Sequence, residues 1–530
     1  MVAEVLARRR VPEIYTLSGG HVFPIYDGCV RSGVAILDVR HEQTAVFAAE
    51  ARAKLTRRPG VAVLTAGPGV TNGVSGLATA WFNGSPLVVL AGRAPQGRWG
   101  QGSLQELDHL PVVASLTKRA ATVSSGARVA PELEEALDLA GAAHRGPVFL
   151  DFPLEVLYGP AGPAPPPPGP QAPAEADPEE VARAGRLLAR ASRPVLLAGG
   201  DVWWEGAEEA LVALVEGLRV PTFTNGLGRG CLSADHPLYF SRTRPEWALA
   251  DLVCVVGTPL DFRVGFGRFG SAQVLHVVDA PERLAAHVAL AAAPAGPLGR
   301  VLAGMLEAGV AAGPADHEDW VGRLSQEEAA RRAAERAQTE SAASPLHPAR
   351  VVGELGRHLD PDAVVVGDGG DFVSFAGRLL DSYRPGCWLD PGPYGCLGTA
   401  MGYSAAARRV HPDRQVVALV GDGAAGFSLM DADTLVRHGL AVAIVVGNNG
   451  VWGLEKHPMA ALYGYDVAAD LQAGCRYDRV VAALGGAGET VAEPDQLGPA
   501  LDRALASGVP YLVNVLCDPA VSYPRTSSLA

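Results

Sequence analysis

Short, uninterrupted apolar segments recur along the whole chain, separated by longer stretches of mixed polarity. Segments such as GVAVLTAG, SPLVVLAG, RPVLLAGG, DLVCVVG, QVVALVGDG and LAVAIVVGNN are rich in β-branched residues and do not alternate with polar ones. This pattern is typical of strands that are buried on both faces of a parallel sheet. Many segments end in Gly or Gly-Asp, and doubly wound α/β domains bind ligands just beyond the carboxyl ends of their strands. The pattern therefore predicts an α/β fold with doubly wound parallel sheets.

Two interruptions divide this pattern into three blocks. Residues 159–178 (GPAGPAPPPPGPQAPAEADP) are so rich in proline that they indicate an extended linker. Residues 316–345 include EEAARRAAERAQTESAASP, which predicts an exposed, charged linker helix. Three domains of residues 1–158, 179–315 and 346–530 result, and a chain of 530 residues is too long for one ordinary domain.

Charge and cysteine content exclude several classes of protein. The net charge of −13 argues against a nucleic-acid binder and against a polybasic membrane anchor. The seven cysteines are odd in number and form no C-x-x-C pair, which is typical of a cytoplasmic protein without a disulfide framework or structural zinc. The N-terminus lacks the features of a signal peptide, and no run of about 18 apolar residues occurs, so we expect no membrane association.

Polar residues follow two consecutive apolar segments of the third block. One segment runs into Gly421-Asp422-Gly423, and the next runs into Asn448-Asn449-Gly450-Val451. We expect these strand ends to lie side by side, where the Asp422 carboxylate, the Asn449 amide oxygen and a backbone carbonyl would suit Mg²⁺. Small residues here would let a phosphate approach the backbone: Gly421, Gly423, Ala424 and Ala425. Each motif alone is typical of a turn, and the pair is much more specific.

The sequence GPYGCLGTAMGYSAAARRVHPDRQVVALVGDGAAGFSLMDADTLVRHGLAVAIVVGNNGVWGLEK resembles the pyrophosphate domain of the thiamine-diphosphate-dependent acetolactate synthase superfamily. That superfamily includes oxalyl-CoA decarboxylase and 2-hydroxyacyl-CoA lyase. The resemblance implies that Asp422, Asn449 and the Val451 carbonyl hold the Mg²⁺ of the cofactor. It also implies that the Gly395 carbonyl accepts a hydrogen bond from the aminopyrimidine and that Leu397 is the bulky residue that bends the cofactor. The acetolactate synthases have Met at the position of Leu397.

The first block contains RHEQTAVFAAEARAKLTRRPGVAVLTAGPGVTNGVSGLATAWFNGSPLVVLAG, which resembles the pyrimidine domain of the same superfamily. The resemblance assigns Glu42 to a hydrogen bond with N1′ of the aminopyrimidine. A glutamate that shares a proton there favours the imino form of the 4′-amine, which can then deprotonate C2. The other interpretation of Glu42 is a solvated residue in the first turn of a helix. The neighbouring GPGVTN motif, with Pro68 and Asn72, favours the cofactor role.

Two residues of the first block are candidates for contact with the substrate. Gln105, in Ser-Leu-Gln-Glu, matches a Phe-Gln-Glu stretch of the acetolactate synthases. His21 follows Leu-Ser-Gly-Gly, where it could act as an acid or base at the reacting centre or be a satisfied histidine at a turn. His41, His109 and His457 are interpreted as structural.

The middle block resembles the nucleotide-binding domain of the superfamily. Gly199 and Gly200 follow a predicted strand, and Arg263 is retained from a motif that contacts substrate near a flavin. Pro259 and Phe262 depart from that motif, and an Arg-containing loop is closer to the CoA-lyase branch, which holds ADP. FAD or ADP is therefore the ligand expected in this domain.

These features together predict a thiamine-diphosphate-dependent carboligase or decarboxylase that acts on a 2-oxo acid such as pyruvate. One alternative is a 2-hydroxyacyl-CoA lyase or oxalyl-CoA decarboxylase, which the stretch 389–395 (LDPGPYG) favours. Another is a non-catalytic nucleotide-binding regulatory homologue. The resemblance also implies a homodimer or homotetramer in which two subunits share each cofactor.

Overall fold

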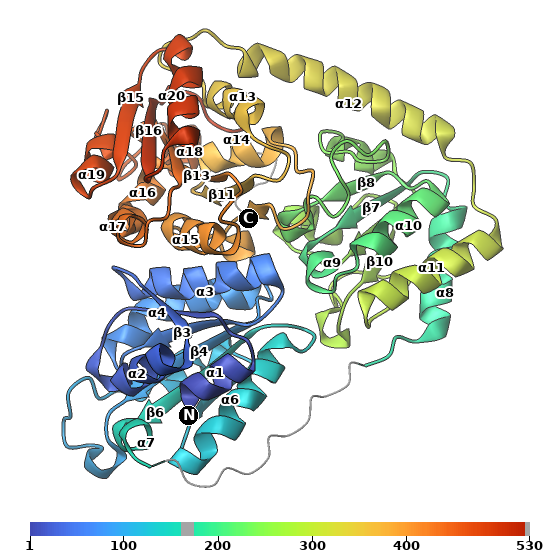
Figure 1. The fold of residues 1–530 in the computed structure, drawn as a ribbon. Coiled ribbons are helices and arrows are strands. Elements are labelled where there is room, and N and C mark those ends of the chain that lie inside the picture. Colours follow the sequence, from blue (N-terminus) through green and yellow to red (C-terminus); the bar gives the residue numbers. More distant parts are fainter. Residues whose placement is uncertain (161–173, 525–530) are drawn as a thin grey trace.

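The chain folds into three α/β units, each built on an entirely parallel sheet (Figure 1). The computed structural model describes residues 1–160 and 174–524, so most of the predicted linker 159–178 lies outside the described residues. The first sheet has the order β2-β1-β3-β4-β6-β5. Its strands are β1 (Glu13–Thr16), β2 (Ala35–Asp38), β3 (Gly60–Leu64), β4 (Leu87–Arg93), β5 (Arg119–Thr122) and β6 (Pro147–Pro153). The predicted α/β class with three parallel sheets is confirmed.

The third sheet repeats the topology of the first, since its order is β12-β11-β13-β14-β16-β15. Its strands are β11 (Val364–Asp368), β12 (Trp388–Leu389), β13 (Val416–Gly421), β14 (Ala443–Asn448), β15 (Ala487–Val491) and β16 (Tyr511–Leu516). The central sheet has the order β10-β9-β7-β8. Its strands are β7 (Pro194–Ala198), β8 (Thr222–Thr224), β9 (Leu252–Val256) and β10 (Gln273–Val277). Side chains of the interior strands are buried, as the non-alternating apolar pattern requires.

Helices cover the sheets of all three units. The N-terminal unit has α1 (Val2–Arg8), α2 (Phe23–Ser32), α3 (Glu42–Thr56), α4 (Pro68–Phe82), α5 (Leu110–Val113), α6 (Gly126–Gly141) and α7 (Leu154–Tyr158). The central unit has α8 (Pro178–Arg190), α9 (Gly200–Trp204), α10 (Glu208–Leu218) and α11 (Leu298–Ala312), and α12 (Glu318–Thr339) follows it. The C-terminal unit has α13 (Pro348–His358), α14 (Asp371–Leu379), α15 (Ala400–Val410), α16 (Asp422–Ser428), α17 (Ala432–Arg437), α18 (Gly453–Tyr463), α19 (Tyr477–Ala483) and α20 (Pro494–Ala506).

Helices α3 and α15 join the N-terminal and C-terminal units, and they face each other in Figure 1. The rings of Phe47 and Tyr403 meet edge to face, with centroids 5.9 Å apart. A Cβ atom on Gly402 would lie only 2.8 Å from the carbonyl oxygen of Thr44, so the close approach of the two helices requires glycine there. One continuous apolar core therefore spans both units.

Helix α12 differs from the exposed helix that its charged sequence predicts. Its first turns pack against the central unit, where Trp320 is buried and donates a hydrogen bond from Nε1 to the carbonyl of Pro194 (3.0 Å). Further along, Glu328 and Glu335 are also buried. The buried face of α12 therefore carries charged side chains as well as apolar ones. The buried charges are neutralised by partners from other segments.

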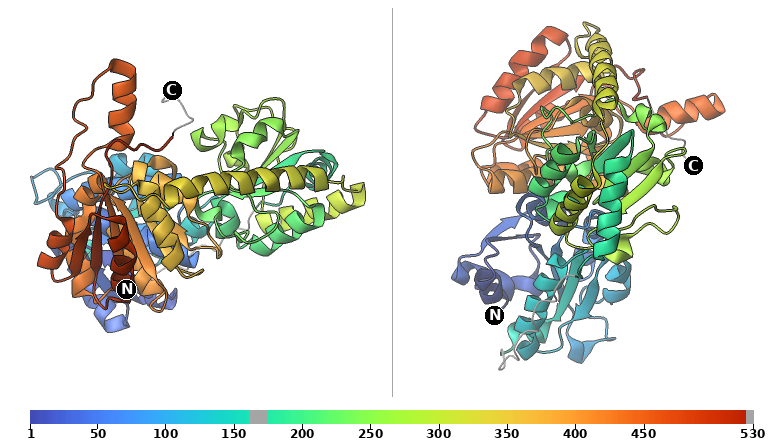
Figure 2. Two further views of the ribbon diagram at one scale, coloured as in Figure 1. Left: turned by 90° about the horizontal axis from the view of Figure 1, so that it is seen from above. Right: turned by 90° about the vertical axis from the view of Figure 1, so that its right-hand side faces the viewer.

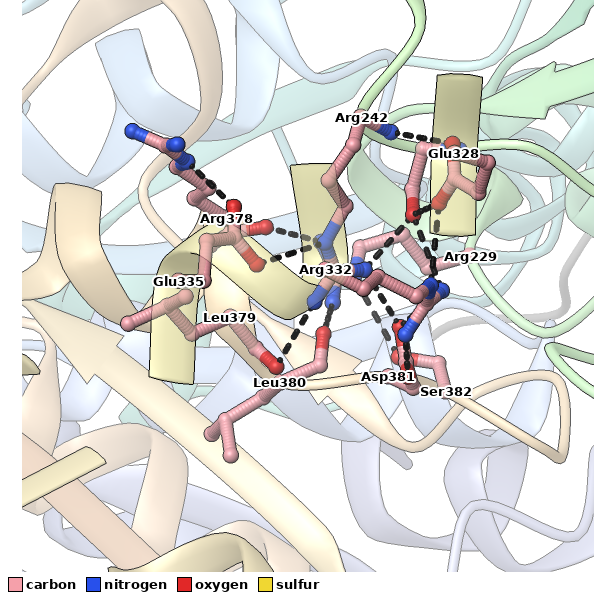
Figure 3. A network of polar contacts seen from close by, with 12 residues as sticks. Arg229, Arg242, Glu328, Arg332, Glu335, Arg378, Leu379, Leu380, Asp381 and Ser382 are labelled. Carbon is pink, nitrogen blue, oxygen red and sulfur yellow. Dashed lines mark hydrogen bonds and ion pairs between the residues drawn. The ribbon is translucent and has the colours of Figure 1, made fainter. Parts of the chain in front are cut away.

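Figure 3 shows these partners. Nε of Arg242, from the central unit, lies 3.2 Å from Glu335, and its Nη1 lies 2.7 Å from Asp381, just after α14. Arg332 reaches the same Asp381 at 2.8 Å. Buried charges are tolerated only when they are paired in this way. The network fastens α12 to both the central and the C-terminal units, and it assigns Arg242 a structural role.

Two further expectations can be compared with the structure. No helix in residues 1–160 or 174–524 is long and apolar enough to cross a membrane. All seven cysteines lie in the described part of the chain, and all are free thiols.

Candidate active site

The Asp422 carboxylate lies where two strands of the C-terminal sheet end together. Strands β13 and β14 are neighbours, with Gly421 in register with Gly447, so the predicted juxtaposition of the two strand ends is confirmed. Asp422 accepts hydrogen bonds from the backbone N–H groups of Gly450 (2.6 Å) and Gly423 (2.9 Å). Burial nevertheless raises the pKa of Asp422 to about 6, because desolvation outweighs these hydrogen bonds.

The adjoining turn supplies further oxygen atoms. Oδ1 of Asn449 accepts a hydrogen bond from the N–H of Val451 (3.2 Å), which closes the turn after β14. Nδ2 of Asn448 donates to Oδ1 of Asn514 (3.0 Å), while its own buried Oδ1 has no hydrogen-bond partner among the described residues. A buried carboxylate beside amide and carbonyl oxygens is the donor set that Mg²⁺ prefers, so the residues present fit this ion.

Both packing and anion binding favour small residues beside Asp422. A Cβ atom on Gly423 would lie 2.5 Å from the ring of Trp452, so the packing of that ring already requires glycine. Gly421 precedes α16, and Ala424 lies in its first turn, where backbone N–H groups remain unpaired within the helix. Unpaired N–H groups at a helix start are suited to binding an anion.

A second loop of the C-terminal unit carries Gly395 and Leu397. Gly395 has a φ of +69°, which favours glycine, and Leu397 is partly buried against the shared core. Asp368, the last residue of β11, holds this loop, since its carboxylate accepts from the N–H groups of Gly398 (3.1 Å) and Ala400 (2.8 Å). Burial raises the pKa of Asp368 to about 7. This role of Asp368 was not predicted from the sequence, although Asp368 follows an apolar segment in the same way as Asp422.

Glu42 begins helix α3 in the N-terminal unit and is 6% exposed. His41 precedes it as the N-cap and accepts a hydrogen bond from the N–H of Gln43 (3.1 Å). One carboxylate oxygen of Glu42 accepts a hydrogen bond from the side chain of Asn72 (3.0 Å). Pro68 starts α4, and the GPGVTN motif therefore lies directly against Glu42. A solvated first-turn glutamate does not describe this buried side chain.

His21 and Gln105 lie close to the same motif. His21 is buried, with Nδ1 3.2 Å from Oγ1 of Thr65 at the end of β3, and burial lowers the pKa of its ring. Gln105 has a φ of +59° and packs on Gly67, where an added Cβ would lie 2.9 Å from the Gln105 carbonyl. The structure thus brings His21, Gln105 and Thr65 around one edge of the N-terminal sheet. Thr65 had no signal in the sequence.

The remaining histidines have protein partners or lie apart from this edge. His109 is fully buried, where Nε2 accepts from the N–H of Gly67 (2.9 Å) and Nδ1 lies 2.9 Å from Asp151. These contacts position the glycine motif. His457 lies on α18.

The start of helix α3 also contacts the C-terminal unit of the same chain. Nε2 of Gln43, next to Glu42, donates a hydrogen bond to the carbonyl oxygen of Leu397 (3.0 Å). The backbone N–H of Arg40 donates to Asp431 (2.7 Å), and this carboxylate also accepts from Thr44 (2.6 Å). The start of α3 is therefore anchored on the C-terminal unit beside the Leu397 loop.

The central unit borders a narrow crevice between all three units. Gly200 and Arg263 line it, together with Lys54 of the N-terminal unit and Trp388 of the C-terminal unit. Arg263 forms an ion pair with Asp261 (2.7 Å). Gly199 lies close against Thr258, so its lack of a side chain is required by packing, whereas the nearest heavy atom to a Cβ on Gly200 would be 3.5 Å away.

The buried Glu42 of one unit and the oxygen-rich strand ends of another suit an enzyme that holds a diphosphate cofactor between two α/β domains. Comparison with family models agrees. The N-terminal TPP binding domain of thiamine pyrophosphate enzymes matches residues 1–112, the central domain matches 181–305, and the C-terminal TPP binding domain matches 368–515. The chain belongs to the thiamine pyrophosphate enzyme family.

Individual relatives narrow the class further. The chain is 51% identical to a probable acetolactate synthase of Mycobacterium bovis and to the acetolactate synthase large subunit IlvG of Mycobacterium tuberculosis. Each alignment covers 100% of this chain and 97% of the relative. It is 34% identical to 2-hydroxyacyl-CoA lyase 2 of Caenorhabditis elegans, over 97% of this chain and 89% of the relative. The resemblance found in the sequence is confirmed, and the chain is a thiamine-diphosphate-dependent, acetolactate synthase-like enzyme.

Proposed function

We propose that this enzyme releases CO₂ from a 2-oxo acid such as pyruvate and joins the remaining fragment to a second carbonyl compound. The observation that carries the proposal is the 51% identity to acetolactate synthases over the complete chain, against 34% for a 2-hydroxyacyl-CoA lyase. Retention of both Glu42 and Asp422 in buried, hydrogen-bonded positions supports an active enzyme over a non-catalytic regulatory homologue.

The cofactor roles follow from the donor atoms available. Asp422, Asn449 and the Val451 carbonyl would hold Mg²⁺, and the backbone at Gly421, Gly423 and Ala424 would face the diphosphate. Thiamine diphosphate, when bound, supplies the electron sink for cleavage and formation of bonds next to a carbonyl.

Residues of the N-terminal and C-terminal units would contact the aminopyrimidine ring of the cofactor. Glu42 would share a proton with N1′, because its buried carboxylate has only Asn72 as a hydrogen-bond donor in the described residues. Pro68 and Asn72 would line that end, the Gly395 carbonyl would accept from the 4′-amine, and Leu397 would press on the cofactor from the opposite unit.

His21 and Gln105 are proposed to face the substrate. Both lie beside the GPGVTN motif, and the lowered pKa of His21 keeps its ring neutral at pH 7, so that it can accept a proton. Its contact with Thr65 would orient the ring for this purpose.

An adenine nucleotide, FAD more than ADP, is proposed for the central crevice, with Gly199, Gly200 and Arg263 at its border. The crevice lies beyond the carboxyl ends of a parallel sheet, and Lys54, Arg263 and Arg283 line it with cations suited to a diphosphate.

A homodimer or homotetramer is proposed for the assembled enzyme. Large apolar side chains are exposed next to the candidate site, including Phe427 (57% exposed) and Met430 shortly after Asp422. Helix α18 projects from the body of the chain in Figure 2, and it ends in exposed Leu462 and Tyr463. Exposed apolar surface of this kind marks protein interfaces. The seven free thiols support the cytoplasm as the proposed compartment.

The purified enzyme, supplied with Mg²⁺ and thiamine diphosphate, should consume pyruvate and release CO₂ together with a ligated product. A parallel incubation with a 2-hydroxyacyl-CoA tests the second candidate, which the LDPGPYG stretch favours. Cleavage of the acyl-CoA without turnover of any 2-oxo acid would replace the first proposal by the second. Inactivity on both substrates in a correctly folded, cofactor-loaded protein would contradict both.

A further inference from the structure

Three side chains that commonly bind metals meet where the N-terminal and central units touch. His144 lies between α6 and β6, Asp201 lies in α9 directly after β7, and Asp279 follows β10. One ring nitrogen of His144 and one carboxylate oxygen from each aspartate lie within 4.8 Å of one another. Nδ1 of His144 is 3.0 Å from both oxygens of Asp279 and 3.9 Å from Oδ1 of Asp201.

The Asp201 carboxylate lacks the partners that a buried charge needs. Asp201 is 8% exposed and lines the central crevice. Its side chain accepts no hydrogen bond within residues 1–160 and 174–524, and His144 at 3.9 Å is its ion-pair contact there. Leaving a carboxylate buried without donors is costly, and the second carboxylate of Asp279 adds repulsion. Asp201 therefore has no close hydrogen-bonded partner of its own among the described residues.

The neighbouring guanidinium groups form no ion pair with Asp201 in the described residues. Arg145 is engaged by Glu205 (2.7 Å) and reaches Asp279 only at 3.9 Å, while Arg283 lines the crevice nearby. A divalent cation would give Asp201 a closer partner than His144, whose ring nitrogen lies 3.9 Å away.

The orientation of His144 is fixed by its other side. A Cβ atom on Gly84 would lie 2.5 Å from Nε2 of the ring, so the ring packs directly on the backbone of Gly84. Nδ1 is therefore directed at the two aspartates, and the imidazole is preorganised as a ligand through that nitrogen.

We propose that His144, Asp201 and Asp279 form a binding site for a divalent transition-metal ion, Zn²⁺ in particular, between the N-terminal and central units. In tetrahedral coordination with bonds of about 2.0–2.1 Å, ligand atoms lie roughly 3.3 Å apart. The His144 distances of 3.0 and 3.9 Å bracket that value. An imidazole ligand favours zinc over magnesium, which distinguishes this site from the oxygen-only site at Asp422. The fourth position would open onto the central crevice.

This site was not expected from the sequence. The spacing of the cysteines excludes only zinc sites built from cysteine pairs, and no cysteine takes part here. The ligands come from three segments, and His144 and Asp279 are 135 positions apart in the chain.

Zinc binding to the full-length, tag-free enzyme tests the proposal. Calorimetric titration with ZnCl₂ is carried out with Mg²⁺ and thiamine diphosphate already saturating, so that the cofactor site does not contribute. The wild type should bind one Zn²⁺ per chain more tightly than Asp201→Asn and His144→Gln, by at least about tenfold. Glu208→Gln is the matched control, because Glu208 of the central unit pairs with Arg57 of the N-terminal unit outside the cluster, and its zinc affinity should equal that of the wild type.

Equal zinc affinity in the wild type and Asp201→Asn would overturn the proposal. Circular dichroism melting identifies any variant that fails to fold. If the variants fail to fold, a measurement on the wild type alone still tests the proposal. Co²⁺ should give the visible absorption of a four-coordinate site, and added Zn²⁺ should abolish that absorption. Absence of that spectrum also overturns the proposal. Neither readout depends on the reaction that the enzyme catalyses.

Discussion

The side-chain nitrogen of Asn72 lies 3.0 Å from Oε2 of Glu42, so that the GPGVTN motif and the start of α3 share one buried hydrogen bond. The contact leaves the remaining hydrogen-bonding capacity of Glu42 for a ligand. It also links two positions that the family resemblance singles out separately.

Replacing Glu42 by Gln should leave the cofactor bound and slow exchange of its C2 proton by orders of magnitude, because an amide cannot share the proton at N1′. NMR-monitored deuterium exchange at C2 is the measurement. Asn72→Ala is the companion variant. It removes one hydrogen bond to a charged group, so the effect should be closer to about tenfold. Near-normal exchange in Glu42→Gln would rule out Glu42 as the activating group.

Replacing Asp422 by Ala should abolish binding of thiamine diphosphate, because the Mg²⁺ proposed to link the diphosphate to the protein would lose its carboxylate ligand. Calorimetry with Mg²⁺ and cofactor checks this. Asp433→Ala is the matched control, since this carboxylate pairs with Arg437 on the exposed side of α17 (2.8 Å). Unchanged cofactor affinity in Asp422→Ala would remove this residue from the metal site.

Asp368 should make the stability of the protein depend on pH. Burial raises its pKa from 3.8 to about 7, so the folded chain retains a proton that the unfolded chain releases between these values. Its contribution to the free energy of unfolding is fully present below pH 3.8 and is lost as the pH rises towards 7. Asp368→Asn should flatten that dependence. Denaturant unfolding at several pH values measures it, and an unchanged slope between pH 4 and 7 would contradict the assignment.

The same aspartate should matter for the Leu397 loop. Asp368→Ala leaves the N–H groups of Gly398 and Ala400 without an acceptor, whereas Asp368→Asn retains one. We expect the alanine variant to lose more cofactor affinity than the asparagine variant, by about tenfold or more. Equal affinities would mean that the loop does not depend on this acceptor.

Subunits that carry Glu42→Gln should complement subunits that carry Asp422→Ala if two chains share each cofactor, because some mixed dimers would contain one intact site. Activity of subunit-exchanged mixtures is the measurement, and each variant alone is the control. Full activity in a species shown to be monomeric by ultracentrifugation would contradict the shared site.

The central unit should release an adenine nucleotide when the enzyme is denatured. A yellow preparation with a flavin spectrum indicates FAD, and a colourless protein that releases ADP indicates the CoA-lyase branch. Arg263→Ala should weaken retention of either nucleotide. A central unit that is empty in the purified enzyme and binds neither compound would contradict the nucleotide proposal.

The sequence alone determined the three parallel sheets and the pairing of the Asp422 and Asn449 strand ends. Both depend on local composition. Buried strands correspond to continuous apolar segments, and the polar residues at the strand ends follow those segments directly in the sequence. The family motifs around Glu42 and Gly395 could be read from the sequence for the same reason, since each occupies one continuous stretch.

Only the tertiary structure decided which side chains from distant segments meet. The burial of Glu335 in the arginine network, the hold of Asp368 on the Leu397 loop and the cluster of His144 with Asp201 and Asp279 had no local signal. The local sequence around a charged residue is the same whether its side chain is exposed to solvent or buried against a partner that is distant in the chain. Its environment is set by domain packing, in which desolvation must be offset by a specific opposite charge or hydrogen bond.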